Sequence, residues 1–215
     1  DAAVLRAPAY MPKASGAPKI DAQGVSALPG PGLHYGVGAL NAAHLRNSGS
    51  GPIWRTVTVI GTPMQSPAAD SHGLSLTKTY YGLDGSRIDP SHLTQGQRVI
   101  VVVTGRSDRA EQRPIVVDDP LPAGFEIDSV LSAEDAQNGP FGFIGKISDL
   151  KVSEARDDRY VAALDVSSDH GFTLAYIARA VTPGDYYLPG AEARDFYRAD
   201  TFARTGGGRT VIAPR

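Results

Sequence analysis

The sequence predicts an all-β protein with an antiparallel β-sandwich fold and at most short helical turns. Turn-forming residues are frequent among the 215 positions, with 24 glycines and 16 prolines spread along the chain. This composition favours short strands joined by turns over long helices. Between the turn signals lie about eight to ten segments that are β-branched or alternate between apolar and polar residues, which is typical of a sandwich.

The N-terminal part divides into a turn-rich segment and a predicted hairpin. Five prolines and six glycines interrupt residues 1–38, so we expect a loop that acts as a linker or a strap. Residues 40–45 and 53–60 are expected to form two strands around an Asn- and Gly-rich turn. A polar connection follows, and a domain boundary is predicted between residues 66 and 67.

The longer second part contains the best strand candidates. Residues 99–103 are five consecutive β-branched residues, which indicates a strand that is covered on both faces or central in a sandwich. Ser132 is expected to cap one short helical turn. Further strands are expected at residues 74–81, 114–118, 159–166, 172–181 and 209–212.

Composition narrows the classes of function. The chain has 21 basic and 23 acidic residues, so a nucleic-acid partner is not expected. It has no cysteine, which rules out disulfides, thiolate metal sites and a cysteine nucleophile within it. The five histidines lack the close spacing of metal ligands, so neither a metal nor a cofactor is expected. A start at Asp1 instead of Met suggests a processed product or a fragment.

The chain offers no convincing catalytic constellation, and we expect it not to be an enzyme. The triad residue types in Asp70-Ser71-His72 are adjacent in sequence and cannot form a triad by themselves. Asp118 and Asp119 are strand neighbours and should point to opposite faces. In place of a catalytic pair, Asp165 is expected to form a cross-strand ion pair with Arg179.

An aromatic pair near the C-terminus is the most interesting candidate site. Phe196 and Tyr197 follow a Pro-Gly turn and sit among charged residues, which argues against both rings being deep in a core. A tyrosine combines an apolar face with a polar hydroxyl and suits a surface that docks on another domain. From the residues alone, docking and ordinary packing both remain open.

Several segments in order resemble the C-terminal end of a bacterial alpha-2-macroglobulin, over roughly residues 40–215. They are residues 45–52, 57–63, 73–81, 121–127, 157–165 and 179–184. The resemblance implies antiparallel β-sandwiches of the macroglobulin type, which are immunoglobulin-like. Residues 67–215 would be the terminal macroglobulin domain, and residues 1–66 a Pro/Gly-rich strap plus the C-terminal part of the penultimate domain.

The resemblance also implies a function. Members of the family are large periplasmic inhibitors that trap proteases: a protease cuts a bait region, the molecule rearranges, and an internal Cys–Gln thioester captures the attacker. Because this chain has no cysteine, it would be a non-catalytic piece of such an inhibitor or a member that has lost the bond. Its partners would be the thioester domain and other macroglobulin domains of the same parent chain, and target proteases through the full-length protein. Any membrane tether would lie in the parent chain.

The same resemblance assigns the candidate site residues. An aromatic loop of the last domain covers the thioester in this family, and Phe196 and Tyr197 occupy the matching positions. Glu192 matches an acid commonly found before that pair and would support the loop. Two apolar faces can keep water away from a bond that hydrolyses when wet. The alternative is a cell-surface or adhesive sandwich that binds a partner through a sheet edge.

Overall fold

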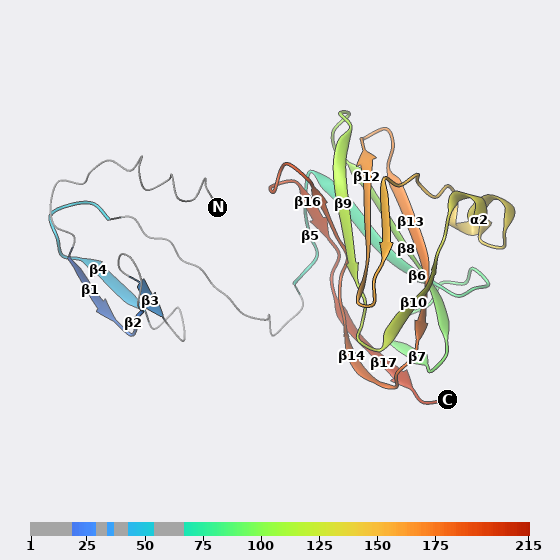
Figure 1. The fold of residues 1–215 in the computed structure, drawn as a ribbon, viewed down its shortest axis with the longest axis horizontal. Helices are drawn as coiled ribbons and strands as arrows, with labels where there is room; N and C mark the ends of the chain where they lie inside the picture. Colours follow the sequence, from blue (N-terminus) through green and yellow to red (C-terminus); the bar gives the residue numbers. More distant parts are fainter. Residues whose placement is uncertain (1–18, 29–33, 37–42, 54–66) are drawn as a thin grey trace. The chain divides into compact units, whose positions relative to one another are not determined.

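The computed structural model describes residues 19–28, 34–36, 43–53 and 67–215 (Figure 1). The chain divides into two compact units, Asp1–Gly61 and Thr62–Arg215. The predicted boundary at residues 66 and 67 stays a prediction, because residues 54–66 lie outside the described residues. Most of the expected strand at 53–60 lies outside them as well.

Within its described residues, the first unit contains four short strands in two pairs. Strand β1 (Ile20–Gln23) pairs antiparallel with β4 (His44–Asn47), and β2 (Ser26–Leu28) pairs antiparallel with β3 (His34–Gly36). The prediction that residues 1–38 are loop is therefore wrong for three of these strands. Strands of three or four residues fit between the turn-forming residues, and Gly24, with φ 69°, supplies the left-handed turn between β1 and β2.

The second unit is built on two main antiparallel sheets, visible in Figure 1. The first has the order β10 (Phe125–Val130), β13 (Phe172–Ala180), β8 (Arg98–Ser107) and β6 (Leu74–Tyr81). The second has the order β11 (Val152–Ala155), β12 (Arg159–Val166), β9 (Arg113–Pro120), β15 (Glu192–Asp195), β16 (Phe202–Arg204) and β5 (Asp70–His72). The prediction of an antiparallel all-β fold is confirmed.

A smaller three-stranded sheet completes the second unit. Its order is β14 (Gly184–Leu188), β17 (Gly208–Ala213) and β7 (His92–Thr94). Strands β14 and β17 are antiparallel, whereas β17 and β7 are parallel. The buried Ile212 of β17 belongs to the same hydrophobic core as the two main sheets, so this sheet is part of the sandwich domain.

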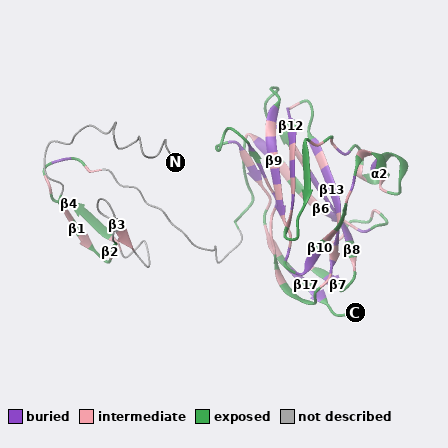
Figure 2. Cartoon of the chain, viewed as in Figure 1, coloured by how far each residue is buried: buried purple, intermediate pink, exposed green. Residues whose placement is uncertain are grey.

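The core explains why β8 carries an uninterrupted apolar run. Its odd-numbered residues, such as Val101, pack in one core with Ile115 and Val117 of the opposite sheet. Its even-numbered residues, Ile100 and Val102, belong to a second, smaller cluster on the other face. Figure 2 shows the buried residues concentrated in these strands. Both faces of β8 are covered, as the sequence predicted.

A short helical insertion covers that second face. Helix α2 (Ala133–Asn138) and the 3₁₀ turn η3 (Gly142–Ile144) follow β10. Ser132 caps α2: its hydroxyl accepts from the Asp135 N–H, and the Asp135 carboxylate accepts from the Ser132 N–H at 2.7 Å. The predicted cap is confirmed. Within the described ranges, no helix is long and apolar enough to cross a membrane.

The ion pairs of the second unit test two expectations about charged residues that were drawn from the sequence. Asp119 points into the core, where it pairs with Lys78 at 2.5 Å, whereas Asp118 points outward and pairs with Arg159. The two neighbours therefore lie on opposite faces, as predicted. The predicted pair of Asp165 with Arg179 is wrong, because β12 and β13 belong to different sheets. Asp165 pairs with Lys151, and Arg179 pairs with Glu126 and Asp128.

Candidate functional site

The aromatic pair lies on the turn between β15 and β16, residues 196–201, which we call the aromatic turn. Phe196 is 67% exposed and Tyr197 is 80% exposed, more than any other large apolar side chain among the described residues. The two rings contact each other edge to face, with centroids 5.1 Å apart and planes at 77°. This is a favoured geometry for an aromatic pair. The pair therefore forms one apolar surface that faces away from the sandwich core.

Backbone hydrogen bonds hold the aromatic turn at both ends. The Phe196 N–H donates to the carbonyl of Pro114 in β9 at 2.9 Å. Asp195 N–H donates to the Thr201 carbonyl, and Thr201 N–H donates to the Arg198 carbonyl, each at 3.0 Å. The turn is thus closed on itself and tied to the neighbouring strand, which gives the exposed rings an ordered base.

Asp195 is the centre of this base. One carboxylate oxygen, Oδ1, accepts from the backbone N–H groups of Tyr197 and Arg198 at 2.9 and 3.1 Å. The other, Oδ2, accepts from Nη1 of Arg113 at 3.1 Å, and both side chains of that ion pair are buried. Burial alone would raise the pKa of Asp195, but the hydrogen bonds from the two N–H groups and the Arg113 guanidinium outweigh it and lower the pKa.

Buried polar residues gather at this end of the sandwich. Strand register places the start of β9 beside the ends of β12 and β15, and the short connection from β8 to β9 brings the end of β8 to the same end of the sandwich. Of the seven buried polar or charged residues in the part of the chain that the structure describes, five lie at these strand ends or next to them: Ser107, Arg113, Ser167, Asp195 and Thr201, which immediately precedes β16. The aromatic turn therefore rests on a group of buried polar residues that are joined by hydrogen bonds.

Glu192, which the sequence assigned to supporting the loop, is the first residue of β15. It lies opposite Asp118 of β9 and Arg204 of β16, and its carboxylate pairs with Arg194 at 2.7 Å. Its supporting role stays a prediction. The sequence analysis missed Asp195 and Arg113. An aspartate two residues before an N–H that it can bind is a local signal that could have found Asp195, whereas Arg113 is distant in sequence.

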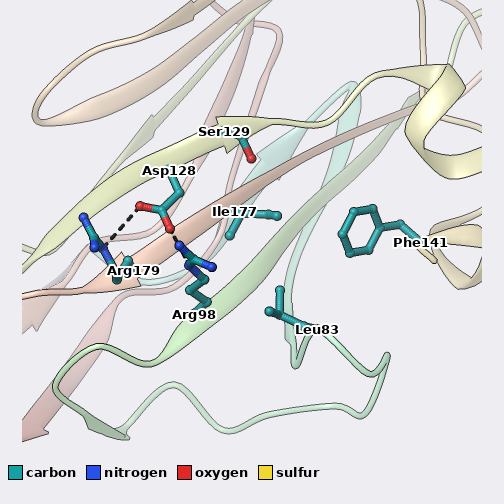
Figure 3. Close-up of a pocket in the computed structure, with 7 residues that line it drawn as sticks. All are labelled: Leu83, Arg98, Asp128, Ser129, Phe141, Ile177 and Arg179. Carbon is teal, nitrogen blue, oxygen red and sulfur yellow. Dashed lines mark hydrogen bonds and ion pairs between the residues drawn. The ribbon is translucent and has the colours of Figure 1, made fainter. Parts of the chain in front are cut away.

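A second candidate is an open pocket of about 550 Å³ on the outer face of the β10-β13-β8-β6 sheet (Figure 3). It is lined by Leu83, Arg98, Asp128, Ser129, Phe141, Ile177 and Arg179. Asp128 lies between the two arginines, 2.7 Å from Nε of Arg98 and 3.2 Å from Nε of Arg179. Because the Asp128 carboxylate partly neutralises both arginines and is itself engaged with them, the pocket offers no free charged group among its described lining residues, and it is a weaker candidate than the aromatic turn.

Metal binding finds no support in the part of the chain that the structure describes. No group of three or more His, Cys, Asp or Glu side chains there is arranged to hold an ion. Of the residue types that bind metals, the acidic side chains described above are engaged with arginine, lysine or backbone N–H groups.

The fold and the site together define a class of protein: an antiparallel β-sandwich that presents an aromatic pair on an ordered turn. Residues 73–200 match the model of the bacterial alpha-2-macroglobulin MG10 domain. The chain belongs to this family, and the resemblance found in the sequence is confirmed.

Relatives and solved structures agree with this assignment. Alpha-2-macroglobulin of Xylella fastidiosa is 35% identical over 172 residues, which are 77% of this chain and 10% of the relative. A Salmonella alpha-2-macroglobulin reacted with methylamine superimposes with a TM-score of 0.68 at 30% identity, over 90% of this chain and 13% of that chain. Escherichia coli alpha-2-macroglobulin activated by porcine elastase gives 0.58 at 28% identity, over 72% and 14%. The chain spans about a tenth of the length of its curated relatives.

Proposed function

We propose that this chain is the non-catalytic C-terminal part of a periplasmic protease-trapping inhibitor, and that its last domain shields a thioester held in another segment of the same protein. The observation that carries the proposal is the exposure of Phe196 and Tyr197 on a turn held by buried groups. Adjacent large apolar rings that remain exposed on an ordered segment are typical of a surface that meets a partner.

The chemistry of such a bond explains why two rings would be useful. A thioester reacts with water and with small amines, so its lifetime depends on how well its surroundings exclude both. Phe196 contributes a purely apolar face, and Tyr197 adds a hydroxyl that can remain at the wet edge of the contact. Closing such a contact removes water from the reactive group, and opening it exposes that group, which makes the turn part of a two-state switch.

Two of the related proteins are consistent with this chemistry. The Salmonella protein was solved after reaction with methylamine, and the Escherichia coli protein after activation by porcine elastase. We transfer both properties to the protein that carries this chain as part of the proposal: a group that reacts with small amines, and a trigger that is a protease.

The partners of this chain follow from its lack of cysteine. It has no cysteine, so the thiol of the reactive bond must come from a thioester domain elsewhere in the complete protein. Other macroglobulin domains of the same protein would be its neighbours, and proteases would be met through the complete molecule. We place that molecule in the periplasm and assign any membrane attachment to a segment outside this chain.

The test replaces one ring in the complete protein. Tyr197→Ala should speed inactivation by methylamine by about tenfold, because part of the barrier that excludes the amine is removed. The measurement is the rate at which a free thiol appears. Tyr187→Ala, which removes a tyrosine that is also exposed but lies on β14, should leave the rate unchanged and is the matched control.

Equal rates in the wild type and the Tyr197 variant would contradict a shielding role. If methylamine releases no thiol from the wild type at all, the complete protein has no thioester to shield. The remaining explanation for the exposed rings would then be the adhesive sandwich, which binds a separate partner and needs no reactive bond.

A further inference from the structure

The first two residues of β9 bind the aromatic turn and the residue before it in different ways, one through its backbone and one through its side chain. Pro114 accepts the Phe196 N–H through its carbonyl, and Arg113 binds Asp195 through its side chain. We propose that Arg113 and Asp195 are positioning residues: their buried ion pair holds the turn so that Phe196 and Tyr197 are presented in one fixed arrangement. This inference rests on the proposed shielding function for its consequence, but the contact itself can be tested without it.

The geometry of Asp195 shows how the pair acts on the rings. Its Oδ1 atom binds the N–H of Tyr197 itself, so the backbone that carries the more exposed ring is fixed directly by the carboxylate. A second bond to the Arg198 N–H fixes the next peptide. Without the carboxylate, both donors would have to turn toward water, and the hydrogen bonds that define the direction of the rings would be lost.

Arg113 has little else to bind. Its nearest alternative acid is Glu111, which is exposed and lies 3.5 Å from Nη2. Its Nε atom is buried and has no hydrogen-bond partner among residues 19–28, 34–36, 43–53 and 67–215. A buried guanidinium with one unsatisfied donor is costly unless its charge is met, so Arg113 holds Asp195 in its ionised form. An ionised Asp195 in turn accepts hydrogen bonds more strongly than a neutral carboxyl group.

A fixed arrangement matters because docking a mobile segment costs conformational entropy. Two rings on a mobile turn would have to be ordered each time that the contact forms. The entropic cost of this ordering would offset part of the free energy of the contact. A turn that is already ordered avoids this loss. The Arg113–Asp195 pair would therefore strengthen the contact between the two rings and the thioester segment without contacting that segment itself. In this respect its role differs from that of the rings.

The first experiment measures the turn in the 215-residue chain alone, by amide hydrogen exchange. In Asp195→Ala, exchange at Tyr197 and Arg198 should be faster by about tenfold, while amides in the middle of β8 keep their protection. Asp185→Ala removes a carboxylate from an exposed arginine pair on β14 and should change neither amide. Unchanged exchange at Tyr197 and Arg198 in Asp195→Ala would overturn the proposal.

Conservative variants separate positioning from simple loss of folding. Asp195→Asn keeps an oxygen that can accept the two N–H bonds but loses the charge that Arg113 binds. It should recover part of the protection that Asp195→Ala loses, and Arg113→Lys should lose less than Arg113→Ala. If Asp195→Ala does not fold, the Asn and Lys variants are compared with the wild type, and exchange at the two turn amides as slow as in the wild type would overturn the proposal.

The second experiment uses the complete protein and the methylamine assay. Asp195→Ala should raise the inactivation rate by about threefold, less than Tyr197→Ala, because the rings are present but less ordered. If Tyr197→Ala raises the rate and Asp195→Ala does not, the positioning role is wrong and the shielding function stands. If neither variant changes the rate, the shielding function fails, and hydrogen exchange alone decides whether the pair holds the turn.

Discussion

The sandwich contains two buried ion pairs, Lys78–Asp119 and Arg113–Asp195, which differ in what each carboxylate does with its second oxygen. Asp119 accepts a hydrogen bond from the hydroxyl of Tyr176 at 2.8 Å. Both partners of its carboxylate, Lys78 and Tyr176, are therefore side chains of the core. Asp195 accepts backbone N–H groups of the aromatic turn. The first pair joins strands of opposite sheets, whereas the second joins the sandwich to an exposed loop.

This difference shows that burial and charge alone do not identify the structural role of an ion pair. Burial by itself would lower the pKa of Lys78, but the Asp119 carboxylate outweighs it and raises the pKa. Burial and the nearby Asp119 charge also raise the pKa of Tyr176, so its hydroxyl remains a donor. The Lys78 pair is thus a closed structural unit, while the Arg113 pair leaves one carboxylate oxygen available to the backbone N–H groups of the exposed aromatic turn.

The largest expected effect comes from breaking the central pair. Asp119→Ala leaves Lys78 charged and buried without its counter-ion, which should lower the free energy of unfolding by about 3–5 kcal/mol. Urea denaturation of the 215-residue chain measures this. Asp118→Ala removes the neighbouring carboxylate on the exposed face and should cost no more than about 1 kcal/mol. Similar losses in the two variants would mean that the Lys78 pair is not the structural unit described above.

Acidification should act on the aromatic turn through Asp195. Its pKa is lowered in the folded chain, so its contribution is fully present above the unfolded value of about 3.9 and is lost as the pH falls through the folded value. NMR signals of the Tyr197 and Arg198 amides should therefore stay in place from neutral pH to about pH 4 and shift only below it. A shift of either amide between about pH 7 and pH 5 would point to another titrating group.

The smallest expected effect is on the stability of a chain that loses an exposed ring. Phe196→Ala should change the free energy of unfolding by no more than about 0.5 kcal/mol, because the ring has little contact with its own domain. Phe125→Ala, which removes a buried phenylalanine, should cost about 3–5 kcal/mol. Urea denaturation compares the two. A substantial loss in Phe196→Ala would indicate that the ring packs on its own sandwich in solution.

Prediction of the fold succeeded where the signal was local. The run at residues 99–103 predicted a strand covered on both faces, and Ser132 predicted a helix cap, because periodicity and capping depend on neighbouring residues. The loop prediction for residues 1–38 failed, because strands of three or four residues are too short to show a pattern between prolines and glycines. The Asp165–Arg179 pairing failed because it assumed that successive strands share a sheet.

Prediction of the site also succeeded for residues that are adjacent in the chain and failed for residues that are far apart in it. Phe196 and Tyr197 could be selected from composition and resemblance, since both residues and their charged neighbours are adjacent in the chain. The ion pair that seats them could not, because Arg113 and Asp195 are separated by 82 residues. Their meeting depends on β9 pairing with β15, which no local pattern specifies.

By itself, the sequence determined the class of fold, the strands with strong periodicity, the absence of cysteine and the aromatic pair that marks the candidate site. Only the tertiary structure decided which strands share a sheet, that the two rings face outward, and that Arg113 reaches the carboxylate beneath them. The physical reason is that turn and strand preferences depend on short stretches of chain, whereas burial and ion pairing depend on residues that folding brings together from far apart.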